Sequence, residues 1–164
     1  NPTTITLPAG GGGSTIAFNL GLPANIFNGS SQILNFQIAS SNANLLQFTE
    51  PASLINSFSS GTFTATADDV GIWSFDYGIT INTTTAANVC DIAFIKILTN
   101  GSQVFSGFSY VTNGGNGQYN HISNSIIMNL ALGEGVAVRL NGTGPSVILG
   151  GNKSAFSRFS GHKL

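Results

Sequence analysis

Apolar and polar residues alternate with a period of two along much of this chain, and the alternation continues to the last residues. The longest such run is GIWSFDYGITI, in which the large apolar side chains at odd-numbered positions share one face. They are Trp73, Phe75, Tyr77, Ile79 and Ile81. This pattern predicts a β-strand that turns one face toward a core.

Other stretches repeat the signal over shorter distances. The alternating apolar positions are Ile16, Phe18 and Leu20, then Leu34, Phe36 and Ile38, then Phe63, Ala65 and Ala67. The segment VCDIAFIKIL is nearly continuously apolar, which is typical of a strand covered on both faces. It is followed by TNGS at residues 99–102, and Asn-Gly between two apolar runs predicts a hairpin.

The segment SIIMNLALGEGVAVRLNG predicts two strands joined by a tight turn. Its first arm places Ile126, Met128, Leu130 and Leu132 on one face, Gly133, Glu134 and Gly135 make the turn, and Val136, Val138 and Leu140 form the answering face. In total we expect about nine or ten strands, at the spacing of a β-sandwich. No segment has a convincing helical period, so the predicted fold class is all-β.

The first residues differ from the rest. NPTTITLPAGGGGS combines prolines with four consecutive glycines, which predicts a flexible leader over residues 1–14. Residues 15–164 fit a single domain. The glycine run does not predict a phosphate-binding loop, because no lysine follows it. The chain begins at Asn1 without a methionine, which we interpret as a processed chain or an excised domain.

Composition restricts the function classes. Only 7% of the residues are charged, against about 25% in an average protein, so the polar surface must be built from Ser, Thr, Asn, Gln and Gly. The net charge of −1 leaves no basic face for a nucleic acid. No apolar run approaches the ~18 residues of a membrane helix, so we expect no membrane insertion. Cys90 is the single cysteine and so cannot form a disulfide within the chain, and we interpret it as a small buried apolar residue.

Catalytic and metal-binding signals are weak. His121, His162 and Cys90 do not have metal-ligand spacing. Neither a nucleophile elbow nor a convincing pair of glutamates is present, so we expect no enzyme activity. Asp68 and Asp69 are weak calcium candidates, but calcium takes about six to eight oxygen ligands, and an Asp pair is an ordinary turn signal. We therefore expect no cofactor.

The segment YVTNGGNGQYNH mixes rigid aromatic residues with adaptable amides. Its candidate ligand-binding residues are Tyr110, Asn113, Tyr119, Asn120 and His121. Such a mixture suits recognition of a sugar or a protein. A plain Gly- and Asn-rich loop is the alternative interpretation.

Three segments within residues 45–164 resemble, in order, the globular heads of the complement C1q family. FSSGTFTATADDVGIWSFDYGI has the family's Gly-x-Phe-Thr strand followed by Gly-aromatic-x-Phe, at Gly61, Phe63, Thr64, Gly71, Trp73 and Phe75. MNLALGEGVAVRL is similar to its Leu-x-Leu, Gly-acidic, Val-x-Val segment. RFSGHKL resembles its closing Phe-Ser-Gly-Phe-Leu-Leu strand through Phe159, Ser160, Gly161 and Leu164.

The resemblance implies a ten-stranded jelly roll of the C1q and tumour necrosis factor (TNF) type that assembles as a homotrimer. In that family the C-terminal strand lies inside a sheet, near the three-fold axis. The residues expected in the core or at the trimer interface are Trp73, Phe75, Tyr77, Phe156, Phe159 and Leu164. His162 replaces an apolar residue of the family, so we expect it to be partly buried.

Two functional hypotheses follow. The first is a trimeric, non-catalytic head of an extracellular filament or surface fibre on a spore, virion, phage or cell, which binds a host protein or glycan. Collagen-like repeats upstream of Asn1 would favour this hypothesis. The alternative is a structural jelly-roll subunit of a coat or capsid.

Overall fold

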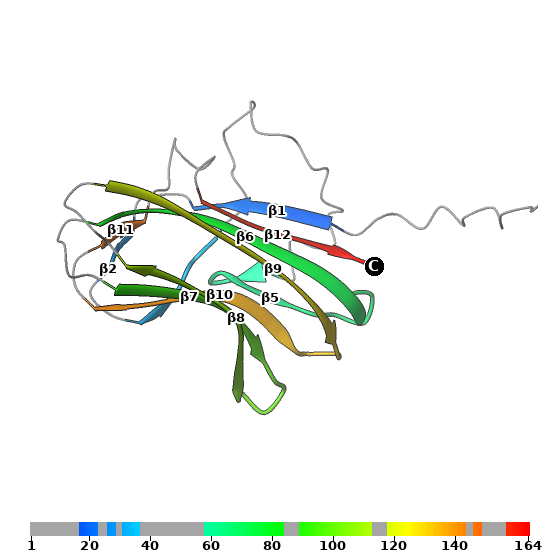
Figure 1. The fold of residues 1–164 in the computed structure, drawn as a ribbon. Coiled ribbons are helices and arrows are strands. Elements are labelled where there is room, and N and C mark those ends of the chain that lie inside the picture. The colour runs from blue at the N-terminus through cyan, green and yellow to red at the C-terminus, as the bar shows by residue number, and fades with distance from the viewer. Residues whose placement is uncertain are drawn as a thin grey trace, which may run out of the picture.

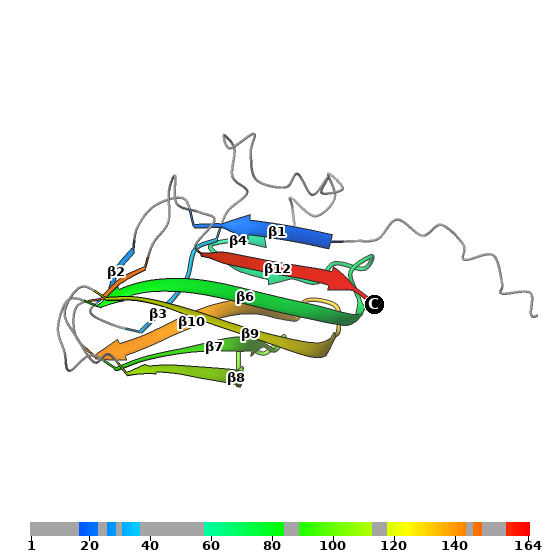
Figure 2. The same cartoon turned by 45° about the horizontal axis from the view of Figure 1, so that its top comes forward.

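The computed structural model describes residues 17–22, 26–28, 31–36, 58–83, 89–112, 118–143, 146–148 and 157–164. All regular structure in these ranges is β-structure, arranged as two antiparallel sheets that stack face to face (Figures 1 and 2). The predicted leader, as well as Ile16 and Ile38, lies outside the described residues.

The first sheet, sheet A, is ordered β1 (Ala17–Gly21), β12 (Arg158–Lys163), β6 (Gly71–Thr83), β11 (Ser146–Ile148) and β2 (Ile26–Asn28). Strand β9 (Gln118–Leu130) pairs with the whole length of β6. The second sheet, sheet B, is ordered β4 (Phe58–Ser59), β5 (Thr62–Thr64), β10 (Gly135–Thr143), β7 (Val89–Ile97) and β8 (Gln103–Thr112). Strand β3 (Gln32–Ile33) pairs with β10.

This arrangement confirms the all-β jelly roll. The described residues contain twelve strand segments where about ten were expected, because several segments, such as β3 and β4, are only two residues long. The hairpin predicted at TNGS is also confirmed, since the Leu98 amide donates to the Ser102 carbonyl (2.8 Å) and Gly101 has a positive φ of 82°.

The space between the sheets is filled by the predicted alternating positions. All five odd-numbered apolar residues from Trp73 to Ile81 are buried, as are Val136, Val138 and Leu140 of β10. Aromatic rings dominate one end, where Phe63 lies 4.8 Å from Trp73 and 5.4 Å from Phe18 between ring centroids. Strand β7 is buried on both of its faces, as its continuous apolar sequence predicted.

Strand β12 is an interior strand, which explains why the chain stays apolar near its end. It pairs with β1 on one side and with β6 on the other, so that Phe159 lies between Leu20 and Tyr77 and is fully buried. Gly161 has a packing reason: a Cβ there would come within 2.7 Å of the rings of Phe18 and Phe75. The small residue therefore lets both rings close over the strand.

Three details of the predicted pattern are wrong. Ala67 and Leu132 are exposed in turns, because their strands end before them. The strand expected through Leu34 and Phe36 covers only Gln32–Ile33 there. Beyond it, the Phe36 amide donates to the Leu34 carbonyl (2.9 Å) in a tight turn, although both side chains remain buried.

Tyr77 links the two sheets at the edge formed by β8 and β9. Its hydroxyl lies 3.1 Å from the Ile92 carbonyl and 3.2 Å from the Gly107 carbonyl, to which it donates. The Asn124 side-chain amide donates to the same Gly107 carbonyl (2.9 Å). Burial raises the pKa of Tyr77 above its ordinary value of 10.0, so the phenol stays protonated as a donor.

Candidate ligand-binding surface

The residues predicted to form one ligand-binding loop lie mostly in strands and on different faces. Tyr110 belongs to β8 and pairs with Asp91 on the outer face of sheet B. Tyr119 and His121 belong to β9 and share the outer face of sheet A, whereas Asn120 alternates toward the interior. Asn113 lies outside the described residues. The predicted single loop site is therefore replaced by two separate surfaces.

Two members of the predicted set have local roles. The His121 Nδ1 atom lies 3.0 Å from the Thr80 hydroxyl, which holds the imidazole against β6. The Asn120 side-chain nitrogen is buried without a hydrogen-bond partner, because it turns toward the sandwich interior beside Ile81.

The acidic pair at Asp68 and Asp69 is used in turn geometry. The Asp69 carboxylate accepts hydrogen bonds from the Thr66 amide (3.1 Å) and the Thr66 hydroxyl (2.6 Å), while the Asp68 carbonyl accepts one from the Lys163 ammonium (2.7 Å). The Asp69 carbonyl also accepts from the indole N–H of Trp73 (2.7 Å). Within the described ranges, no three His, Cys, Asp or Glu side chains gather as metal ligands.

The residues expected in the core or at an interface fall into buried and exposed groups. Trp73, Phe75, Tyr77 and Phe159 are buried in the sandwich, and Phe156 lies outside the described residues. Leu164 is exposed, and its amide donates to the Ile72 carbonyl (2.9 Å). His162 is exposed, so its expected partial burial is wrong. It alternates with the inward Gly161 and lies on the outer face of sheet A beside Ser74.

Three exposed aromatic residues of β8 form a row on the outer face of sheet B, and the sequence analysis missed two of them. Phe105 and Phe108 have ring centroids 6.1 Å apart and an interplanar angle of 18°. Phe108 and Tyr110 follow at 6.4 Å and 16°. We call Phe105, Phe108 and Tyr110 the aromatic row. Large exposed apolar groups arranged together mark interaction surfaces.

A β-bulge brings the aromatic row onto one face. Simple alternation would separate Phe105 from Phe108, because one position is odd and the other is even. The pairing of β7 with β8 shifts register between Ile92 and Phe94, so Gly107 and Phe108 together oppose Ala93. Gly107 has a φ of 61°, which a glycine adopts without strain. An isolated glycine inside an apolar strand is the sequence signal that could have revealed the bulge.

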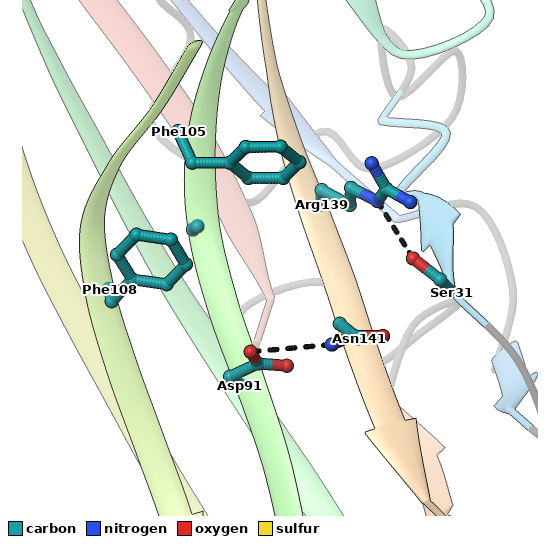
Figure 3. Close-up of a pocket in the computed structure, with 7 residues that line it drawn as sticks. Ser31, Asp91, Phe105, Phe108, Arg139 and Asn141 are labelled. Carbon is teal, nitrogen blue, oxygen red and sulfur yellow. Dashed lines mark hydrogen bonds between the residues drawn. The ribbon is translucent and has the colours of Figure 1, made fainter. Parts of the chain in front are cut away.

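Polar side chains border the aromatic row across the strands β7 and β10 (Figure 3). The Arg139 guanidinium lies 5.2 Å from the centroid of the Phe105 ring. It donates to the Ser31 hydroxyl (2.8 Å) and to the Gln103 side-chain oxygen (3.0 Å). The Asn141 amide lies 3.4 Å from the Asp91 carboxylate.

Together with the two phenylalanines, Ser31, Asp91, Arg139 and Asn141 line an open hollow of about 330 Å³. It contains one cation, one anion, one amide, one hydroxyl and two aromatic rings. These groups can bind a ligand that is both apolar and hydroxylated, but they include no pair of side chains arranged for nucleophilic or acid–base chemistry.

The outer face of sheet A has a different character. Small polar residues occupy its middle, including Ser74, Ser123, Ser125 and Ser160, and Tyr119 lies at the end where β6 finishes. Its apolar part lies at the end where β6 begins and β12 ends. There Ile72 and Ile127 are exposed on neighbouring strands, and Leu164 is bonded to Ile72 through its backbone.

No protein-family model and no curated protein sequence matches this chain. Solved structures do. The globular domain of zebrafish complement 1qA aligns with a TM-score of 0.58 at 15% identity, over 90% of this chain and 96% of that one. Murine APRIL aligns with a TM-score of 0.64 at 10% identity, over 92% of this chain and 100% of that one. Eiger TNF from S. frugiperda aligns with a TM-score of 0.65 at 10% identity, over 92% of both chains. The fold is therefore the C1q and TNF jelly roll.

Proposed function

We propose that this chain is the non-catalytic head domain of an extracellular filament or surface fibre. In this proposal three copies assemble through the outer face of sheet A, and the assembled head presents a surface to a host protein or glycan. The observation that carries the proposal is the fold, which aligns with C1q and TNF domains over at least 90% of this chain. The resemblance in the sequence motifs implies the same trimeric assembly.

The surface of sheet A supports this mode of assembly. The serines in its middle have short side chains, so another copy can approach this face closely. Charged residues are sparse on it, and Asp76 and Arg158 lie on neighbouring strands. Ile72, Ile127 and Leu164 supply exposed apolar area at one end. An apolar centre surrounded by small polar residues is typical of a protein interface.

The remaining observations agree with an outward-facing module. The surface depends on Ser, Asn, Thr and Gly more than on charge, since only 7% of the residues are charged. Among the described residues, no helix has the length and hydropathy needed to cross a bilayer.

Sedimentation velocity at micromolar concentration tests the assembly. We expect a single species with about three times the chain mass of 16.9 kDa. Replacing Ile127 with Lys should convert it to monomers, because a charged side chain would be buried in the interface without a partner. A parent protein that sediments as a monomer would contradict the proposal.

Leu132→Lys is the matched control for this variant. Leu132 is 61% exposed and Ile127 is 66% exposed, but Leu132 lies in the turn between β9 and β10 and not in a strand of sheet A. The control should therefore remain trimeric and keep the melting temperature of the parent. Equal loss of the trimer in both variants would place the interface elsewhere.

A further inference from the structure

We propose that the hollow on the outer face of sheet B binds a neutral β-linked oligosaccharide, whose sugar rings lie on the aromatic row. This inference rests on the ligand-binding part of the proposed function. It does not require the trimer, because all of the residues involved come from one chain.

The arrangement of the aromatic row indicates a flat, apolar ligand face. The three rings follow one another at 6.1 and 6.4 Å with interplanar angles of only 18° and 16°. In Figure 3, the ring of Phe108 is seen broadly face-on and extends from β8 toward β7, and the ring of Phe105, seen obliquely, extends across β7. Their faces are therefore available to a flat ligand that runs along β8.

A pyranose with equatorial hydroxyls is such a ligand. Its axial C–H groups form a flat apolar face, and their partly positive hydrogens are attracted to the negative face of an aromatic ring. In a β-1,4-linked chain of these sugars, successive rings continue as one flat ribbon. A ribbon of this shape can contact several members of the row at once, whereas a compact or strongly bent ligand cannot.

The polar border of the hollow supplies the second step. A sugar hydroxyl both donates and accepts hydrogen bonds, and the border offers both functions. Arg139 is held in place by Phe105, Ser31 and Gln103, and its remaining N–H groups have no partner among the described residues. On the other side, Asp91 and Asn141 also line the hollow, and their carboxylate and amide groups add acceptors and a donor to the border.

Charge distinguishes this ligand from anionic ones. The hollow contains one cation and one anion, Arg139 and Asp91, so its formal charges cancel. A phosphate or sulfate group would approach the Asp91 carboxylate with only one arginine to compensate. A hollow of about 330 Å³ is at the lower end of the ~300–1,000 Å³ range of small-ligand sites, and it fits a short stretch of a neutral sugar chain.

Titration with cellohexaose and with chitohexaose, followed by NMR shifts of labelled protein, tests the inference. We expect at least one of these neutral probes to bind, with shifts centred on β8 and its neighbours. Phe108→Ala and Tyr110→Ala should each weaken the dissociation constant about tenfold, because each removes one stacking face. Asn141→Ala should weaken it less, since it removes a single polar contact.

Tyr119→Ala is the matched control. Tyr119 is 62% exposed and Tyr110 is 68% exposed, but Tyr119 lies on the outer face of sheet A. Its removal should leave the dissociation constant within about twofold of the parent. Melting curves of all variants separate lost binding from lost folding, and these exposed substitutions should change stability little.

Binding of either sugar by the parent protein would support the inference. If neither sugar bound at millimolar concentration, the inference would be overturned. It would also be overturned if Tyr119→Ala weakened binding as much as Tyr110→Ala did. If Phe108→Ala instead changed the sedimenting mass, the row would be a contact between copies. Binding by a protein that sediments as a monomer would sustain this inference while refuting the proposed trimer.

Discussion

The outer faces of sheet A and sheet B rest on the same core but are built from different chemistry. Serines and other small polar groups occupy the middle of sheet A, with Ile72, Ile127 and Leu164 at one end and Tyr119 at the other. Sheet B carries an aromatic row beside an arginine and an aspartate. The low face suits contact with a large flat partner, whereas the hollowed face suits a small ligand. In the proposed function, one sandwich therefore separates assembly on sheet A from recognition on sheet B.

The largest expected effect is a loss of folding stability, which would disrupt the outer faces of both sheets together. Phe75→Ala should lower the free energy of unfolding by about 3–5 kcal/mol, because a buried ring is replaced by a cavity between the sheets. Phe75 is fully buried and stacks at 5.6 Å on Trp73. Urea denaturation of the variant measures the change.

Phe108→Ala is the control for that prediction, since Phe108 is a half-exposed phenylalanine of the outer surface. It should change the free energy of unfolding by no more than about 0.5 kcal/mol. If Phe75→Ala were equally mild, the two faces would not depend on a common packed core.

A smaller loss of stability is expected from Gly161→Ala, and it should affect sheet A before sheet B. Gly161→Ala places a methyl group within 2.7 Å of the rings of Phe18 and Phe75, so the strand or the rings must shift. We expect a loss of about 1–3 kcal/mol, as for other overpacked interiors. Below the melting temperature, the proposed trimer should weaken more than the proposed ligand binding does, because β12 belongs to sheet A alone.

Thermal melting, sedimentation and sugar titration of Gly161→Ala would measure these changes together. Ser160→Ala, at the neighbouring position on the outer face, should change stability by less than about 0.5 kcal/mol. Equal weakening of trimer and ligand binding by Gly161→Ala would show that the two faces are mechanically coupled.

The smallest effect concerns the turn that joins β9 of sheet A to β10 of sheet B. Hydrogen bonding from the Ala131 amide (2.8 Å), assisted by Lys96 (2.6 Å), holds the pKa of Glu134 below its ordinary value of 4.5. A lowered carboxyl pKa means that folding favours the ionised form. The stabilisation is present above pH 4.5 and is lost as the pH falls through the lowered value.

Melting temperatures of the parent protein and Glu134→Gln, measured from pH 7 down to acid, check this prediction. The parent should be slightly more stable at pH 7, and the gap should close at low pH and shrink in salt. A gap that widened on acidification would have the wrong sign and would exclude this role of the carboxylate.

The strands were predictable from sequence wherever the period of two was unbroken. The alternation from Trp73 to Ile81 places every inward residue correctly, because one long strand covers all of these positions. Prediction failed where a turn replaced a strand, as at Ala67 and Leu132, since apolar residues also occur at the ends of strands.

The candidate site was harder to predict for a physical reason. A bulge changes which side chains share a face, so the aromatic row does not follow from alternation through Gly107. The polar border adds Ser31, Asp91 and Arg139, which come from separate parts of the chain and meet only across the sheet. Tyr110 was recognised because it is aromatic, but Tyr119 and His121, which were predicted to share its site, lie on the outer face of the other sheet.

The interior position of strand β12 also has a consequence for folding. Strand β1 pairs with β12, with Ala17 opposite His162, although the two strands lie far apart in the sequence. Sheet A therefore cannot close before these distant segments meet. Pairing of such distant segments makes folding slow and leaves β1 and one edge of β6 open for association until β12 is in place. We therefore expect partly folded chains of this protein to associate through these open edges and to need protection by chaperones.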